Sequence, residues 1–503
     1  MTGKMTLGVD FGGSSSKATL IDESGTILAT AVKEYPSYCP KPGWLEQDAT
    51  QFYPVFVEVV REILHKSGVC PDDVVALAID AATHMAIFAD EQDQPIRRMI
   101  HWSDKRCVEE VRWLEAHNSE LLKRCSANSV GTAWTLPQIL WLQKHEPEVL
   151  QRTKRIYFAK DYIRHCITGD FDTDYIEAMG AMLADDESGT WSKELCDLAG
   201  IDMSMLPEIR KPTDVAGHVS AKTSDETGLS EQTVVYVGTT DTALEVYASG
   251  AVEVGCTTVK LATAGRICPV TTGPVASRQF FNYRHVVPGL WYPGTGTSSC
   301  AASYKWYRDV FGTCEKEQAS AGNQDAYELL NQAAEQVPAG SEHLYFHPYL
   351  LGEMTPYYDN QLRASFIGAS MHHTKGHFTR AVMEGVAYSL RDSMEEIYKN
   401  DVMMNQFRII GGGAKGKLWK QIVADVLNEP MVCTANNDSS LGSAMLAGVA
   451  CGMFADYGES VEKCVKVVGV TEPVREHVAV YKEGFEIYRK IQKALAPIYH
   501  AVI

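Results

Sequence analysis

The residues after the first apolar run combine a carboxylate with groups that can bind an anion. In LGVDFGGSSSK, Asp10 ends the run, where it could face a metal ion, and glycines, serines and a lysine follow. A turn without Cβ atoms can present backbone N–H groups to a phosphate. We therefore predict a phosphate site at Gly12, Gly13, Ser14, Ser15 and Lys17. The alternative is an ordinary glycine hairpin with a solvated lysine.

A second carboxylate, Asp241, lies in YVGTTDTALE, where a β-branched run ends and a helix is expected to begin. A carboxylate at a strand end is well placed to accept the proton of a substrate hydroxyl, as the catalytic aspartate of phosphoryl transfer does. The alternative is an aspartate that caps the helix. One residue can also fill both roles.

Polar and aromatic residues follow the apolar run VVALAID. Thr83 and His84 lie just beyond that run, and HWSDKR then brings Trp102 and Asp104. Aromatic rings stack on the CH faces of a polyol, while carboxylates and imidazoles bind its hydroxyl groups. The cluster therefore predicts a polyol site, although a histidine taken alone is more often structural than functional.

Two glycine turns in the second half of the chain are further candidate sites. GGGAK, at residues 411–415, ends a predicted strand, and its glycines let the backbone approach a flat ligand such as a nucleotide base. KLATAG, at residues 260–265, is a turn between short strands like the one after Asp10, so two hairpins would face one phosphate chain. The candidate contacts are Thr263, Gly412, Gly413, Ala414 and Lys415.

These residues need an α/β framework to hold them. Residues 7–34 predict three strands, and apolar residues at three- and four-residue spacing then predict a helix from Phe52 to Leu64, with Asp48 as its cap and Gly68 as its stop. A buried strand follows, and a comparable order returns in the second half. We therefore expect two related α/β halves that meet near Gly250 and leave a ligand-binding cleft between them.

The composition excludes several classes of protein. At 503 residues and 55.5 kDa the chain is too long for one hydrophobic core. The net charge of -18 argues against a nucleic acid or an anionic membrane as partner. The 13 scattered cysteines form no Cys-x-x-Cys pair and indicate reduced thiols in a cytoplasmic protein. No apolar run is long enough for a signal peptide or a membrane span.

Segments along nearly the whole chain resemble, in order, the FGGY carbohydrate kinases of the actin, hexokinase and Hsp70 superfamily. They are GVDFGGSSSKATLID, PGWLEQD, WSDKR, LWLQKHEPE, KDYIRHCITGD, YVGTTDTALE, FHPYLLGEMTP, AVMEGVAYSLRD, IIGGGAKGKLWKQIVADVLNEP and LGSAMLAG. Within this family the chain is most similar to the xylulokinases, through LWLQKHEPE, KDYIRHCITGD and the region around His84.

The resemblance implies two RNase H-like domains with ATP and sugar in the interdomain cleft. The N-terminal, sugar-binding domain would span residues 1–250 and the C-terminal, nucleotide-binding domain residues 251–503. Carried over one at a time, the family's catalytic base falls on Asp241 and its magnesium-site aspartate on Asp10. The first phosphate hairpin falls on residues 12–15 and the adenosine side on residues 411–415. The sugar-side positions fall on His84, Trp102 and Asp104.

The chain departs from the family pattern in two places. Xylulokinases usually carry Gln-Met-His-Gly where this chain has Ala-Thr-His-Met at residues 82–85, so only His84 is retained. The second hairpin usually begins with glycine, whereas here it begins with Ala262, whose Cβ narrows the approach to phosphate. The sugar loop also lacks the Arg-Glu pair that glycerol kinases carry.

The predicted function is therefore the phosphorylation of a small sugar by ATP with Mg2+, and the resemblance favours D-xylulose. The alternatives are a kinase of another ketose, a polyol or a sugar-like signal molecule, and a sensor of sugar or nucleotide that does not catalyse. Retention of Asp10 and Asp241 argues against the sensor, and Ala262 argues weakly for it. A homodimer is kept as a candidate assembly.

Overall fold

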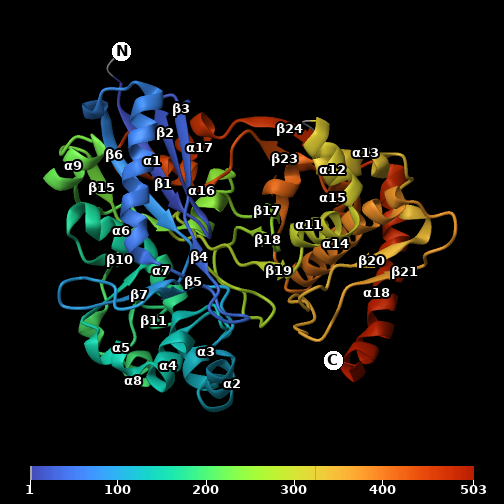
Figure 1. Ribbon diagram of the computed structural model, residues 1–503, viewed down its shortest axis with the longest axis horizontal. Coiled ribbons are helices and arrows are strands. Elements are labelled where there is room, and N and C mark those ends of the chain that lie inside the picture. Colours follow the sequence, from blue (N-terminus) through green and yellow to red (C-terminus); the bar gives the residue numbers. More distant parts are fainter. Residues whose placement is uncertain (1–2, 323–324, 503) are drawn as a thin grey trace. The chain divides into compact units, whose positions relative to one another are not determined.

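The computed structural model describes residues 3–322 and 325–502, and the chain forms two compact units (Figure 1). Unit 1 consists of Met1–Val252, Asn282–Trp291 and Asn436–Lys466, and unit 2 of Glu253–Phe281, Tyr292–Ala435 and Val467–Ile503. Two segments from the second half of the sequence thus belong to unit 1. In the described ranges, no helix combines the length and apolar character that a membrane span requires.

The sheet of unit 1 begins with the predicted three-strand meander. Its strands, in spatial order, are β3 (Ile27–Glu34), β2 (Ser15–Asp22), β1 (Met5–Phe11), β6 (Val74–Ala81), β15 (Val234–Tyr236) and β14 (Val215–His218). The first two pairings are antiparallel, the next two are parallel and the last is antiparallel. The short strand β16 (Thr239–Thr240) also pairs in parallel with the end of β6.

The sheet of unit 2 repeats this pattern. Its strands, in spatial order, are β19 (Thr295–Thr297), β18 (Gly265–Pro269), β17 (Cys256–Leu261), β22 (Asn405–Ile410), β23 (Met431–Thr434) and β24 (Val467–Thr471). The pairings are again two antiparallel, two parallel and one antiparallel. The β1–β2 and β17–β18 hairpins therefore occupy equivalent positions, as the expectation of two related α/β halves requires.

Helices α1 (Phe52–Ser67) and α16 (Ser439–Ala450) both pack on the strands of unit 1 (Figure 1). The apolar stripe of α1 joins the core formed with β1 and β6. Gly68 ends α1 in a left-handed conformation, as predicted, with φ of 64°. The predicted cap is wrong: Asp48 caps the preceding short 3-10 helix η1 (Ala49–Gln51), because its side chain accepts from the Thr50 N–H.

The small residues of α16 allow very close packing. A Cβ atom on Gly8 of β1 would lie 2.0 Å from the Ser440 carbonyl oxygen and 2.3 Å from the Ala444 nitrogen. On α16 itself, a Cβ on Gly442 would lie 2.3 Å from the carbonyl oxygen of Leu244, in α10 (Asp241–Ala248). The predicted small-residue helix therefore lies between β1 and α10 of unit 1.

Unit 2 is built around the long helix α14 (Lys375–Lys399), which packs against β20 (Tyr345–His347), α13 (Ala326–Glu335) and α15 (Lys417–Leu427). Most side chains of α14 are buried, and α15 in turn contacts the last helix, α18 (Arg475–Val502). These helices and the strands share one apolar core. The predicted helices at α14 and α15 are thus confirmed.

The remaining elements complete the two units. In unit 1 they are β4 (Ser37–Tyr38), β5 (Glu46–Gln47), η2 (Pro71–Asp73), β7 (Ala86–Ala89), β8 (Met99–Ile100), α2 (Val108–His117), α3 (Ser119–Cys125), α4 (Thr135–His145), α5 (Pro147–Arg152), β9 (Arg155–Phe158), α6 (Ala159–Thr168), β10 (Asp172–Asp174), α7 (Tyr175–Ala181), β11 (Ala184–Asp185), β12 (Thr190–Trp191), α8 (Lys193–Leu198), η3 (Met203–Met205), β13 (Glu208–Arg210), α9 (Ala221–Thr227) and α17 (Tyr457–Cys464). In unit 2 they are α11 (Ala301–Phe311), α12 (Thr313–Gly322), η4 (Ser341–His343), β21 (Ser365–Ile367) and η5 (Gly412–Lys415). All 13 cysteines are free thiols, as expected.

Candidate active site

Three carboxylates of unit 1 lie at the ends of neighbouring strands. Asp10 in β1 is directly opposite Asp80 in β6, and Asp80 is opposite Thr239 in β16, two residues before Asp241. Because β1, β6 and β16 are parallel, their carboxyl ends meet at one edge of the sheet. The fold therefore brings the two predicted catalytic residues, Asp10 and Asp241, to the same edge.

Burial shapes the electrostatics of this edge. It raises the pKa of Asp10 to about 6, and it raises the pKa of Asp80 well above its ordinary value, with the neighbouring Asp10 carboxylate adding to the effect. The Oδ1 atom of Asp10 is buried without a hydrogen-bond partner in the part of the chain that the structure describes. A buried carboxylate oxygen that lacks a donor is a suitable ligand for a hard cation.

Asp241 is the first residue of α10, and Thr240 occupies the N-cap position. The interpretation of Asp241 as the helix cap is therefore wrong by one residue. Its Oδ1 still accepts a hydrogen bond from the Thr242 N–H at 2.7 Å, and a negative charge at this end is favoured by the helix dipole. The carboxylate is thus held at the helix start and only half-buried.

The hairpin between β1 and β2 has its carbonyl groups tied back into unit 1. The Tyr35 hydroxyl donates to the Gly12 carbonyl, the Gln47 side-chain amide donates to the Gly13 carbonyl at 2.7 Å, and the Tyr35 N–H donates to the Ser14 carbonyl at 3.1 Å. Carbonyl oxygens repel phosphate, so their engagement elsewhere suits an anion-binding turn. The assignment of this turn to phosphate stays a prediction.

Lys17 is paired with a carboxylate, in contrast to the alternative in which it is a solvated lysine. It lies in β2 directly opposite Asp10, and its ammonium forms an ion pair with Asp438, the residue that caps α16. The Thr19 and Ser440 hydroxyls add a hydrogen bond of 2.7 Å between the same two elements. Lys17 therefore joins the phosphate-hairpin strand to α16.

His84 is enclosed by its own unit. Its backbone N–H donates to the buried Glu177 carboxylate at 2.7 Å, and its ring Nε2 lies 2.8 Å from the Tyr283 hydroxyl. The centroid of its ring lies 4.8 Å from that of Trp134. A Cβ on Gly180 would lie 1.7 Å from the His84 Nδ1, so α7 can approach only through glycine. These contacts hold His84 with a φ of 65°, and its role toward sugar stays a prediction.

Asp104 fixes a loop. Its two oxygens accept hydrogen bonds from the Arg106 guanidinium at 3.0 and 2.8 Å, from the Arg106 N–H at 2.8 Å and from the Leu45 N–H at 2.6 Å. A carboxylate has about four acceptor positions, so Asp104 has little capacity left for a ligand. The neighbouring Trp102 is 39% exposed and can offer its ring.

In unit 2 the second hairpin and the glycine turn lie side by side. The Ala262 carbonyl accepts a hydrogen bond of 2.8 Å from the N–H of Ala301, the first residue of α11, and the Thr263 carbonyl accepts one of 3.0 Å from the N–H of Cys300, the N-cap. A Cβ on Gly411, which has a φ of 89°, would lie 2.7 Å from the Leu261 carbonyl oxygen, whereas a Cβ on Gly412 would meet no atom within 4 Å. Packing thus requires Gly411, and open space at Gly412 suits a nucleotide.

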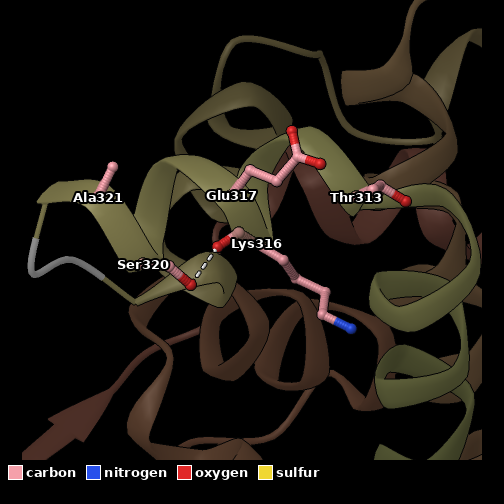
Figure 2. A pocket seen from close by; sticks show the side chains of 5 residues that line it. All are labelled: Thr313, Lys316, Glu317, Ser320 and Ala321. Atoms are coloured by element: carbon pink, nitrogen blue, oxygen red, sulfur yellow. Dashed lines mark hydrogen bonds between the residues drawn. The ribbon is translucent and has the colours of Figure 1, made fainter.

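A hollow of about 530 Å3 lies beside α12 and contains none of the predicted site residues (Figure 2). Thr313, Lys316, Glu317, Ser320 and Ala321 line it, all from this one helix. The Ser320 hydroxyl donates a hydrogen bond of 2.9 Å to the backbone carbonyl of Lys316, one turn earlier in the helix. The hollow is therefore an exposed helix surface, and we do not assign it a ligand.

Comparison with known proteins decides the family. The model for the N-terminal domain of the FGGY family of carbohydrate kinases matches residues 5–247, and the model for the C-terminal domain matches residues 254–451. A xylulose kinase of Lactococcus lactis subsp. lactis is 31% identical over 504 residues, with 99% of this chain and 98% of the relative covered. This chain belongs to the FGGY family of carbohydrate kinases.

Two further proteins extend the comparison. The crystal structure of xylulose kinase from Rhodospirillum rubrum has a TM-score of 0.89 to this chain at 27% identity, and covers 99% of this chain and 100% of its own. A gluconokinase of Bacillus subtilis is 26% identical, with 97% of this chain and 96% of the relative covered. The α/β fold with two RNase H-like domains is thereby confirmed, and the protein is a sugar kinase.

Three residues of this FGGY kinase were not predicted from its sequence. Asp80 stands inside the apolar run VVALAID, as Asp10 stands inside LGVDF, and that likeness was a usable signal. His101, whose Nε2 would lie 3.5 Å from a Cβ on Gly13, is buried, and burial lowers its pKa to about 4. Tyr283 reaches His84 from 199 positions further along the chain, and no local pattern indicates it.

Proposed function

We propose that this FGGY kinase transfers the γ-phosphoryl group of ATP to D-xylulose, with Asp241 as the proton acceptor. The observation that carries the proposal is the arrival of Asp10, in β1, and Asp241, directly after β16, at the same edge of the unit 1 sheet. Asp241 can then orient the sugar hydroxyl, while Asp10 can hold the magnesium ion that binds the phosphates.

The reaction balances with these residues. As the sugar hydroxyl oxygen forms its bond to the γ-phosphorus, its proton passes to the Asp241 carboxylate and the bond to the ADP oxygen breaks. Asp241 lies at the start of α10 and is only half-buried. The hairpin at residues 12–15, with its carbonyls tied back, supports the negative charge of the phosphates.

Asp10 fits the magnesium ion that the proposal includes. Its Oδ1 is buried and has no donor among the described residues. The described ranges contain no group of three or more side chains arranged to hold a metal by themselves. Mg2+ is typically held by one or two carboxylates together with substrate phosphates, and when bound it neutralises developing charge on those phosphates. Such a site requires Asp10 to be free of a protein cation.

Two features favour a neutral ketose over a sugar acid, the class that the gluconokinase relative raises. The Arg106 guanidinium, which lies over the Trp44 ring, is engaged by Asp104 and by Glu46 at 2.8 Å. The buried Lys160 ammonium is engaged by Asp161 and Asp174. These cations are therefore compensated already, and a substrate carboxylate would gain little from them.

The substrate test is a coupled assay of ADP release with D-xylulose, D-ribulose, D-gluconate and glycerol. We expect the highest kcat/KM with D-xylulose. A higher kcat/KM for D-gluconate would mean that the substrate is D-gluconate and not D-xylulose. The Lys105→Met variant would then show whether the Lys105 ammonium, which contacts the Thr132 hydroxyl at 3.3 Å, binds the acid. Absence of ADP release with all four compounds, from protein shown to bind ATP, would overturn D-xylulose as the substrate.

A further inference from the structure

Asp80 is a fully buried carboxyl group that the proposed mechanism does not use. It stands in β6 directly opposite Asp10, so the two side chains emerge on the same face of neighbouring parallel strands. Its Oδ2 accepts a hydrogen bond of 2.6 Å from the Ser443 hydroxyl of α16. The Oδ1 atoms of both Asp80 and Asp10 are buried without a hydrogen-bond partner in the described ranges.

One other buried aspartate of unit 1, Asp174, is compensated by a protein cation. Asp174 is equally buried, but the Lys160 ammonium lies 3.0 Å from it and the Thr239 hydroxyl donates to it at 2.7 Å. No lysine, arginine or histidine among the described residues forms an ion pair with Asp80 or Asp10. Two neighbouring buried carboxylates repel each other and lose hydration, so either a shared proton or a cation from outside the protein must compensate them.

A divalent cation has the right chemistry for this compensation. Hard cations prefer carboxylate oxygens, and Mg2+ is commonly held by one or two carboxylates while water and phosphate oxygens complete its octahedron. Asp10 and Asp80 would supply two oxygens from adjacent strands, which are rigid elements, and α16 orients Asp80 through Ser443. Neither a phosphate nor a sugar hydroxyl would compensate two negative charges.

We infer that Asp80 is a second carboxylate ligand of the divalent cation, bound through Oδ1 beside Asp10. The inference rests on the proposed function, because it adds a ligand to the cation site assumed there. It assigns to this chain a two-carboxylate site formed by the ends of β1 and β6. The competing explanation is that Asp10 and Asp80 only share a proton.

The test measures Mn2+ binding, with and without ADP, by the loss of the free-ion EPR signal. The variants are Asp80→Asn, which keeps an acceptor for Ser443, Asp10→Asn, and the control Asp197→Asn, which changes an exposed carboxylate of α8. We expect Asp80→Asn and Asp10→Asn each to weaken Mn2+ binding by about 10- to 100-fold, and Asp197→Asn to leave it unchanged. The shift of Tm with added Mn2+ should shrink in parallel.

The outcomes separate this inference from the proposed function. Wild-type Mn2+ affinity in Asp80→Asn, with loss in Asp10→Asn, would overturn the role of Asp80 alone and favour the shared proton. Wild-type affinity in Asp10→Asn as well would overturn the cation site, while ADP release would still judge the kinase proposal. If Asp80→Asn does not fold, Asp80→Ser removes the same carboxylate with a smaller side chain, and the same Mn2+ outcomes apply to it.

Discussion

Gly8 offers a direct test of how tightly α16 must lie on β1. A Cβ atom at Gly8 would lie 2.0 Å from the Ser440 carbonyl oxygen and 2.3 Å from the Ala444 nitrogen. An ordinary contact begins near 3.4 Å, so Gly8→Ala would have to displace the backbone of α16 by about 1.4 Å. No flexible side chain can absorb that displacement, because both atoms belong to the helix backbone.

The cost follows from overpacking. Extra atoms in a packed core cost about 1 to 3 kcal/mol, and contact with two backbone atoms places Gly8→Ala near the upper value. For a domain of about 150 to 250 residues, 3 kcal/mol lowers Tm by roughly 6 to 12 °C. Activity should fall too, because Asp438, which pairs with Lys17, and Ser443, which bonds Asp80, both belong to the displaced segment.

The measurement is thermal unfolding of Gly8→Ala together with hydrogen exchange of the amides in α16. The matched control is Gly273→Ala, because a Cβ at Gly273 would meet no atom within 4 Å. The control should unfold within about 2 °C of the wild type, as expected for a surface change. A Gly8→Ala protein with equally unchanged Tm and with protected α16 amides would refute the reasoning about this contact.

Three further predictions follow from single residues. Asp241→Asn should lower turnover by about 100- to 10,000-fold in steady-state assays. Its Tm should stay near that of the wild type, because the amide oxygen can still accept a hydrogen bond from the Thr242 N–H. Near-normal turnover would show that Asp241 is not the proton acceptor. Gly12→Ala should raise the KM for ATP, because the added Cβ would crowd a phosphate. Its Tm should not fall, because the Cβ would lie 3.5 Å from the nearest protein atom, the Ser15 carbonyl oxygen. An unchanged KM for ATP would contradict the hairpin assignment. Burial raises the pKa of Asp186 from 3.8 to about 7, so the folded protein keeps a proton that the unfolded chain releases, and this group lowers stability as pH rises from about 4 to 7. Asp186→Asn should therefore flatten the pH dependence of the urea midpoint in that window, and an unaltered slope would count against the buried carboxyl.

Local features were predictable from the sequence because they depend on neighbouring residues. The meander, the stop at Gly68 and the glycine turn before α15 follow from β-branched runs, helical spacing and residues that tolerate a left-handed backbone. The placement of Asp10 and Asp241 at strand ends was equally local. Asp48 shows the limit, because a short 3-10 helix between a cap and a helix leaves no separate signal.

Long-range partners were not predictable in the same way. The pattern LGSAMLAG predicts a helix of small residues, but the hydrogen bond from the Thr6 hydroxyl to the Ala444 carbonyl joins positions 438 residues apart. Likewise, His84 was grouped with Trp102 as a polyol site, and only the fold shows its contacts with Glu177 and Tyr283. The sequence identifies which residues are unusual, while the partners depend on tertiary packing.

The position of α16 in unit 1 has a consequence for synthesis on the ribosome. The first sheet is complete once β15 and β16 have emerged, yet one of its faces is covered by a helix that the ribosome makes some 200 residues later, at Ser439–Ala450. At typical elongation rates that delay is roughly 10 to 40 s. During this interval the apolar residues that α16 covers remain open to chaperones or to other nascent chains, and a fragment ending near Val252 would keep them exposed permanently.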